Sequence, residues 1–312
     1  MLDVRRLHML KTVAARGSIA AAAQSLALSA GAVSQQLSAL RRDAGVDLLR
    51  PDGRTVALTE AGRVLLEHAE RILAAVQEAE SALAAVKGTV GATVTLAALP
   101  STVDRRPLTV ARIVAPALTA LGSHHPQLTV TCHVTDQAQL RELTLGTVDM
   151  VLGQWYHHLP DATPRGIEVY PLLDDPLIVV TAADRADERP VALRDLAAHS
   201  LAVPPPTTDC GQAILHACHQ AGFTPTTRYV TADIAAQLTL ARAGLATALV
   251  PRTAIDPATP GIRTAPIEDR PILRLPFAAT RHTETANPTT TAVIAALRTA
   301  ARQGRAMHLP AD

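Results

Sequence analysis

Apolar side chains recur every three or four residues through the first part of the chain, and small polar residues separate the runs. This spacing predicts three short helices. Gly17 is placed to end the first helix, and Ser18 and Ser29 are placed to cap the second and third helices through their hydroxyl groups. The connections between the three helices are therefore expected to be short.

The third predicted helix has an apolar face and a small, polar face. Its apolar positions are Val33, Leu37 and Leu40, and its opposite face carries Ala30, Gly31, Ser34, Gln35, Ser38 and Arg41. Small side chains let a helix enter the DNA major groove, and Ser34 and Gln35 offer donors and acceptors to base edges. A polar face of this kind is more often simply solvated, so the interpretation depends on the neighbouring segments.

A charged hairpin is predicted directly after the third helix, because apolar residues flank the Asp52-Gly53 pair on both sides. Arg50 and Arg54 lie beside its tip, where they could reach the DNA backbone or minor groove. Three helices and a hairpin describe a winged helix-turn-helix, which places its recognition helix in the major groove. The predicted DNA contacts are Ser29, Ala30, Ser34, Gln35, Ser38, Arg41, Arg50 and Arg54.

A long helix is predicted from the cap residue Thr59 to about Lys87, since no proline interrupts this segment. Its apolar seam consists of Leu65, Ala69, Ile72, Val76, Ala79, Leu83 and Val86. Steps of four and three are typical of a coiled coil. The helix is about 40 Å long, too long to bury its seam on so small a domain, so pairing with a second copy is favoured over a core helix of one large domain.

Short apolar strands alternate with helices over the remaining two thirds of the chain. The expected strands lie at 94–98, 128–134, 148–152, 168–172, 177–181, 201–203 and 277–280, with a further αβ unit ending at Pro251. The expected helices start near Pro116, at Gln137, near Asp209 and at Pro288. This alternation predicts an α/β fold with a parallel sheet.

Composition and charge support a DNA-binding protein of two or three domains. The chain has 312 residues, 48% hydrophobic residues and a net charge of only +1. Eight basic and four acidic residues fall before position 59, so the positive charge is concentrated on the predicted DNA-binding domain. No signal peptide or membrane-spanning run is recognised, and three cysteines do not suggest a disulfide framework. A cytoplasmic location without a membrane partner is therefore expected.

Four motifs of the first 62 residues together resemble the LysR-type transcriptional regulators. They are Ala21-Ala22-Ala23, Ala32-Val33-Ser34, the run from Gly45 to Arg50, and the run from Leu58 to Gly62. Three positions of the third predicted helix depart from the family pattern: Ala30-Gly31 stand where the family usually has Gln-Pro, and Arg41 stands where it has Glu. The resemblance thus implies DNA binding, with an operator preference that the sequence leaves open.

The resemblance extends along the whole chain and implies its domain organisation. A winged helix-turn-helix would occupy residues 1–58, a linker and dimerisation helix 59–90, and an effector-binding domain 91–312. That last domain would resemble periplasmic binding proteins, with one α/β subdomain at about 92–165 and 266–303 and the other at about 166–265. The implied partners are double-stranded DNA with an inverted repeat, a second copy or a tetramer, and RNA polymerase.

The resemblance also implies a small-molecule effector in the cleft between the two subdomains. The predicted effector-binding residues are Ser101, Thr102, Thr135, Pro205, Thr207 and Thr208. Hydroxyl groups beside helix N-termini suit a carboxylate, although serine and threonine equally serve as turn and cap residues. The stretch 103–115 is longer than the family norm and carries Asp104, Arg105, Arg106 and Arg112, which either anchor an acidic effector or are solvated.

Two alternative functions stay open, one a thiol redox sensor and the other a solute-binding protein with an inert helical domain. Peroxide-sensing members of the family carry a cysteine pair near Cys210 and Cys218. Here the two cysteines are eight residues apart, about 12 Å along a helix, so a disulfide would require the helix to unwind. No enzyme motif, cofactor site or metal site is recognised.

Overall fold

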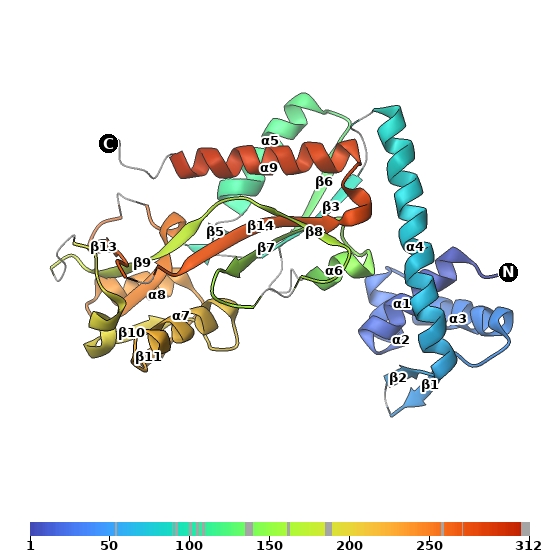
Figure 1. Cartoon of the computed structure of the whole chain (residues 1–312), viewed down its shortest axis with the longest axis horizontal. Coiled ribbons are helices and arrows are strands. Elements are labelled where there is room, and N and C mark those ends of the chain that lie inside the picture. The colour runs from blue at the N-terminus through green and yellow to red at the C-terminus, as the bar shows by residue number, and fades with distance from the viewer. Residues whose placement is uncertain are drawn as a thin grey trace.

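The computed structural model describes residues 1–53, 55–88, 90, 93–99, 102–103, 106–107, 110–134, 140–160, 163–184, 189–256, 259–269 and 271–306. Figure 1 shows a small helical domain at the N-terminus, one long helix that leads away from it, and an elongated α/β region. We call the first domain the head and the α/β region the body.

The head contains three helices and a two-stranded wing. These elements are α1 (Val4–Arg16), α2 (Ile19–Ser25), α3 (Ala30–Ala44), β1 (Leu49–Asp52) and β2 (Thr55–Leu58). The Ser18 and Ser29 hydroxyl oxygens each accept a hydrogen bond of 3.1 Å from the third residue beyond, as the sequence predicts. Gly17 ends α1 with a left-handed φ of 75°. The apolar faces of the three helices then meet in one buried core.

The long helix α4 (Glu60–Lys87) begins beside the wing, packs along α1 and then leads away from the head. The Thr59 hydroxyl oxygen accepts a hydrogen bond of 3.0 Å from the Gly62 amide. Gly62 lies so close to the wing that a Cβ atom there would be 2.0 Å from the carbonyl oxygen of Leu48. Farther along, Ser81 is buried where α4 contacts the 3₁₀ turn η4 (His282–Glu284) of the body.

The body is built on a ten-stranded mixed sheet with the order β11-β10-β12-β9-β14-β7-β3-β6, to which β8 adds on β14 and β13 on β9. We call β3, β6, β7, β8 and β14 with their helices the first half, and β9 to β13 with theirs the second half. The first half has β3 (Thr93–Ala98), β6 (Thr129–Val134), β7 (Met150–Tyr156), β8 (Ile167–Pro171) and β14 (Leu273–Arg281). The second half has β9 (Asp175–Ala182), β10 (Ser200–Val203), β11 (Thr226–Val230), β12 (Thr247–Pro251) and β13 (Ile262–Pro266).

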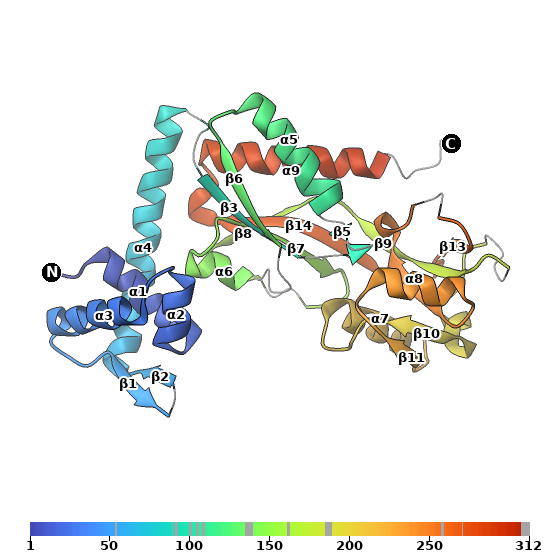
Figure 2. The same ribbon diagram turned by 180° about the vertical axis from the view of Figure 1, so that it is seen from behind.

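Helices cover each half separately. In the first half, α5 (Ala115–His124) and α9 (Pro288–Ala306) pack together over the sheet, as Figures 1 and 2 show from opposite sides, and the short helix α6 (Leu140–Leu145) lies nearest the head. The second half has α7 (Asp209–Gln220), α8 (Ile234–Arg242) and the 3₁₀ turns η2 (Leu193–Ala198) and η3 (Arg252–Ala254). A small hairpin of β4 (Thr102–Val103) and β5 (Arg106–Pro107) and a π-helical turn η1 (Val110–Val114) precede α5.

Two sequence expectations about the sheet are corrected by the structure. Parallel pairing is found for β3 with β6 and β7, and for β10 with β11 and β12, but β14 and β9 run antiparallel to their neighbours. In addition, β8 hydrogen bonds to β14, with Phe277 opposite Pro171, so residues 167–171 belong to the first half rather than to a subdomain that starts at 166. The strands β11 and β13 were not anticipated from the pattern.

Among the described residues, no helix combines the length and the apolar character needed to cross a membrane.

Candidate functional site

The recognition face of α3 is exposed on the head. Its core face is buried, since Val33, Leu37 and Leu40 are at most 7% exposed. On the opposite side, Ser34 and Gln35 are exposed. Ala30, Gly31 and Arg50 are also exposed, and Ser38 is partly exposed. The structure thus presents the polar face expected from the sequence on the outside of the head.

Two of the predicted DNA contacts already have intramolecular partners. The Ser29 hydroxyl oxygen caps α3 by accepting from the Ala32 amide, and the Arg41 guanidinium lies 3.4 Å from the exposed carboxylate of Asp47. An exposed ion pair of this kind contributes about 0–1 kcal/mol, so Arg41 can exchange Asp47 for a phosphate at little cost. Arg54 lies outside the described residues.

The predicted seam of α4 divides into two parts. Leu65 is partly buried and Ala69 is fully buried in the core of this chain's own head, so Ala69 does not face a partner as expected. The other five seam positions are exposed in the single chain, and they are Ile72, Val76, Ala79, Leu83 and Val86. Leu83 and Val86 are 63% and 87% exposed, which is unusual for large apolar side chains on one helix face.

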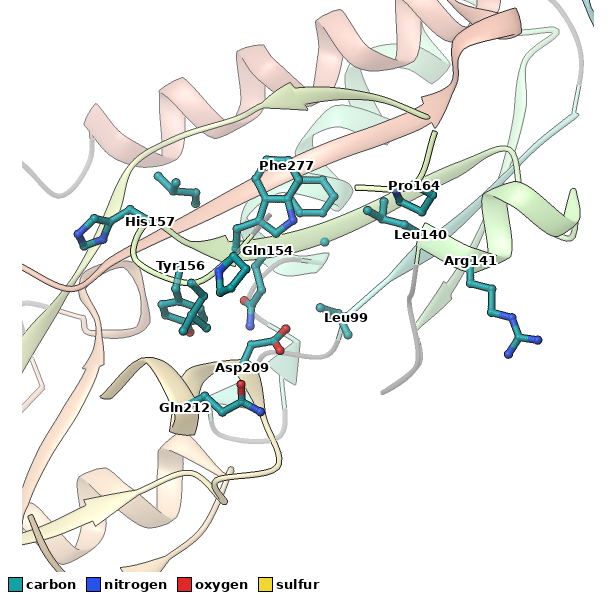
Figure 3. A pocket seen from close by; sticks show the side chains of 15 residues that line it. Leu99, Leu140, Arg141, Gln154, Tyr156, His157, Pro164, Asp209, Gln212 and Phe277 are labelled. Atoms are coloured by element: carbon teal, nitrogen blue, oxygen red, sulfur yellow. The ribbon is translucent and has the colours of Figure 1, made fainter. Parts of the chain in front are cut away.

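A pocket of about 570 Å³ lies in the body between the two halves. Figure 3 shows it from close by, with side chains from β7 and β14 on one side and from the first turn of α7 on the other. The rings of Trp155 and Phe277 are 4.4 Å apart with a tilt of 39° and form an apolar wall. Gly153 makes this arrangement possible, because a Cβ atom there would lie 2.4 Å from the Phe277 ring.

Three of the polar side chains that line the pocket are Gln154 on β7 and Asp209 and Gln212 on α7; Arg141 and His157 also line it. Asp209 is the first residue of α7, and its side chain is exposed. In Figure 3 the Gln154 amide and the Asp209 carboxylate point toward one another across the cavity. These three residues were missed at the level of sequence, although Asp209 directly follows two predicted site residues.

The predicted effector-binding residues contribute less than expected to the described lining. Thr208 caps α7, since its hydroxyl oxygen accepts from the Gly211 amide at 3.1 Å and donates to the Pro205 carbonyl at 2.7 Å. Pro205, Thr207 and Thr208 precede the pocket-lining residues but do not line the cavity themselves. Ser101 and Thr135, together with Asp104 and Arg105, lie outside the described residues, as do the side chains of Thr102 and Arg106.

A buried ion pair lies next to the pocket, where the two halves join. Arg274 of β14 donates from Nε to Asp175 Oδ2 at 2.9 Å, and its Nη1 donates to the Gln154 side-chain oxygen at 3.3 Å. The Thr253 amide and hydroxyl donate to the same Asp175 carboxylate at 3.0 and 2.7 Å. Burial opposes the charge on Arg274, but Asp175 outweighs this effect and holds the pKa of the guanidinium above its usual value.

The cysteines of α7 show no sign of thiolate activation. Burial raises the pKa of the Cys218 thiol to about 11, and burial also raises the pKa of Cys210. Redox-sensing cysteines instead need a lowered thiol pKa and solvent access. Both thiols are free in the structure, which gives the thiol redox hypothesis no support. Within the described part of the chain, no group of three or more histidine, cysteine or acidic side chains is arranged to hold a metal ion.

Two family models together match most of the chain. Residues 4–63 match the bacterial regulatory helix-turn-helix proteins of the lysR family, and residues 89–302 match the LysR substrate binding domain. The first match covers the head and the start of α4, and the second covers the body with its pocket.

Individual transcriptional regulators are also similar to this chain in sequence and in structure. The transcriptional regulator TfdT of Cupriavidus pinatubonensis is 30% identical over 207 residues, which cover 59% of this chain and 87% of that protein. The regulator TcbR of a Pseudomonas species is 29% identical over 257 residues, or 80% of this chain and 83% of that protein. The structure of full-length CbnR complexed with its target DNA is 26% identical, with a TM-score of 0.52, and covers 96% of this chain and 100% of that chain. The chain therefore belongs to the LysR family of DNA-binding transcriptional regulators, which are not enzymes.

Proposed function

We propose that this regulator binds an inverted-repeat operator through the exposed face of α3, with the wing arginines Arg50 and Arg54 on the adjacent backbone. The observation that carries the proposal is the two-sided character of α3, whose core face is buried while Ser34 and Gln35 remain exposed. Two copies are needed to present two such helices to successive major-groove faces. The regulator would act in the cytoplasm, where its operator and RNA polymerase are.

Dimerisation is proposed to use the exposed part of α4. The large apolar side chains of Leu83 and Val86 are 63% and 87% exposed in the single chain, and those of Ile72 and Val76 are 39% and 36% exposed. Pairing two such helices would bury this seam, which the body of the same chain leaves uncovered. Assembly of two dimers into a tetramer remains compatible with this arrangement.

The effector is proposed to bind in the pocket between the halves. Its volume of about 570 Å³ suits a small molecule, and most of its lining is apolar with a few polar groups. The carboxylate effector expected from the sequence rests on Ser101, Thr102, Thr135, Thr207 and Thr208. Those side chains either lie outside the described residues or away from the cavity, so the chemistry of the effector has to be argued from the residues that line it.

The signal from the pocket to the head is proposed to pass through α6. Leu140 and Arg141 at its start line the pocket. The next residue, Glu142, forms an ion pair of 2.9 Å with Arg16 at the end of α1. At the other end of α6, the Leu145 carbonyl lies 3.0 Å from Nε2 of His8, also in α1. Figures 1 and 2 both place α6 between the sheet and the head, so an effector that moves α6 would change how the head is held.

A gel-shift assay with the DNA upstream of the chain's own gene tests the proposal. Specific binding to this DNA, with a response to a compound that also raises the melting temperature of the protein, is the expected result. A chain that binds small molecules but shows no preference for any DNA sequence would instead be a solute-binding protein with an inert helical domain.

Gln35→Ala and Arg50→Ala are expected to weaken operator binding in different ways. Loss of the Gln35 amide removes a base contact, so it should cost about 1–3 kcal/mol and relax the preference at one base pair of each half-site. Loss of Arg50 removes a phosphate contact, so it should weaken binding to all sequences and lower the salt slope by about one. Fluorescence anisotropy over a salt series measures both effects. An unchanged salt slope would place Arg50 outside the interface.

Arg16→Gln is expected to raise amide hydrogen exchange in α6 by about two- to five-fold, since a partly exposed ion pair contributes about 0.5–1 kcal/mol. Arg6→Gln is the matched control, because Arg6 also lies in α1 but pairs within the head, 2.6 Å from Asp43. Exchange mass spectrometry on peptides that cover 140–145 measures the difference. Equal exchange in the two variants would contradict a mechanical link between the head and α6.

A further inference from the structure

We propose that the pocket takes an effector with a flat apolar body and a positively charged amine, with the amine placed against Asp209. This inference rests on the proposed effector site and assigns the class of molecule that the site binds. It differs from the carboxylate effector that the sequence suggests.

The flat body is indicated by the wall of the pocket. Trp155 and Phe277 are two of the very few aromatic residues in a chain that has one tryptophan and two phenylalanines. They lie in contact at the same side of the cavity, 4.4 Å apart. Leu99 and Leu159 add apolar surface around them. An aromatic ring stacks on such a wall more favourably than a branched or polar body.

The amine is indicated by Asp209. Its carboxylate lines the pocket, and no hydrogen bond or ion pair connects it to another residue in the described part of the chain. The N-terminus of α7 would otherwise favour an anionic ligand through its free amides and its dipole. Here the Thr208 hydroxyl oxygen already accepts from the Gly211 amide, and Asp209 places a negative charge in the first turn of α7. A ligand carboxylate at this end of the cavity would lie beside a like charge.

The positive groups near the pocket do not reverse this preference. Arg141 is exposed, and Figure 3 shows its guanidinium directed away from the other lining side chains. The charge of Arg274 is matched by the buried Asp175 carboxylate at 2.9 Å. The Gln154 side-chain oxygen accepts from Arg274, and its amide group carries no charge that would compete with Asp209. Among the described residues that line the pocket, Asp209 is the one acidic side chain, so we expect it to favour a cationic ligand.

Three carboxylates and three amines with the same aromatic body test this proposal. Isothermal titration of the full chain compares benzylamine, 2-phenylethylamine and 3-phenylpropylamine with benzoate, phenylacetate and 3-phenylpropionate. At least one amine is expected to bind about 10-fold more tightly than its carboxylate counterpart. Asp209→Asn is expected to lower the affinity for that amine by about 10- to 100-fold, which is the usual range for loss of a hydrogen bond to a charged group.

Two further variants test the inference even if Asp209→Asn disturbs the folding of the chain. Gln212→Glu adds a second carboxylate one turn along α7, so it should tighten amine binding by several fold. Asp195→Asn removes an exposed acid from the start of η2, and it should leave amine binding unchanged. Melting temperatures of all three variants verify that the chain is folded.

The outcomes separate this inference from the proposed function. Three results would each overturn the inference. A carboxylate could bind more tightly than its amine counterpart, or no amine could bind to a chain that still recognises its operator. The affinity for the amine could also be unchanged by Asp209→Asn. A chain that binds the amine but shows no sequence-specific DNA binding would instead contradict the proposed function. The inference that the pocket binds an aromatic amine would then still be supported.

Discussion

Gly62→Ala is expected to destabilise the junction between the head and α4 by about 1–3 kcal/mol and to abolish tight operator binding. A methyl group at this position would lie 2.0 Å from the Leu48 carbonyl oxygen and 3.0 Å from its carbonyl carbon. Both atoms belong to the backbone, so no rotamer change relieves the clash. The wing and the first turn of α4 would have to separate, although alanine is otherwise the better helix residue by about 1 kcal/mol.

Gly122→Ala is the matched control for this prediction. Gly122 also lies within a helix, α5, but a Cβ atom there would have no heavy atom within 4 Å. Its replacement is expected to be neutral or to stabilise the chain by up to about 1 kcal/mol. Urea unfolding monitored by circular dichroism measures both variants. A Gly62→Ala chain as stable as the Gly122→Ala chain would show that α4 is not held this tightly against the wing.

Gly62 illustrates what the sequence could and could not reveal. The motif from Leu58 to Gly62 supported the resemblance, and the cap at Thr59 was expected from the sequence. The reason for the glycine became visible only with the backbone of Leu48 beside it. Caps, helix faces and hairpins depend on residues a few positions apart, and they were therefore predicted well. Contacts between separate elements leave no such local pattern.

The strand β14 shows the same limit for the sheet. The sequence pattern predicted a strand at 277–280, but the strand starts at Leu273 and hydrogen bonds with β9 as well as with β7 and β8. An antiparallel neighbour in a largely buried sheet has the same apolar character as a parallel one, so the sequence could not indicate its direction. This strand joins the two halves, and the pocket forms at that junction.

The pocket residues were harder to predict for a related reason. Hydroxyl residues before α7 suit an anion, and the sequence predicts them as ligands, but Thr208 uses its hydroxyl to cap the helix. Gln154, Asp209 and Phe277 come from segments more than fifty residues apart, and only the fold brings them together. The hydroxyl residues therefore lie in the loop that precedes the pocket-lining turn of α7, but the sequence does not show which side chains face the cavity.

Arg274→Met is expected to destabilise the body by about 3–5 kcal/mol, because it leaves the Asp175 carboxylate buried without its guanidinium. The side chains of this pair are 6% and 0% exposed, so water cannot replace the lost partner. Thr253 would still donate two hydrogen bonds to Asp175, which offsets only part of the loss. Replacing Asp175 with asparagine in the same chain should recover part of the stability, since the uncompensated charge is then removed.

The exposed pair of Arg63 and Glu60 in α4 provides the control. Its side chains are 58% and 79% exposed, and Arg63→Met is expected to change stability by no more than about 1 kcal/mol. Urea unfolding of the single and double variants gives the free energies, and titration of the pocket ligand gives a second measurement. Because Gln154 also accepts from Arg274, loss of the guanidinium should weaken ligand binding even where the chain remains folded. Equal losses of stability in Arg274→Met and Arg63→Met would mean that the junction of the halves does not depend on this ion pair.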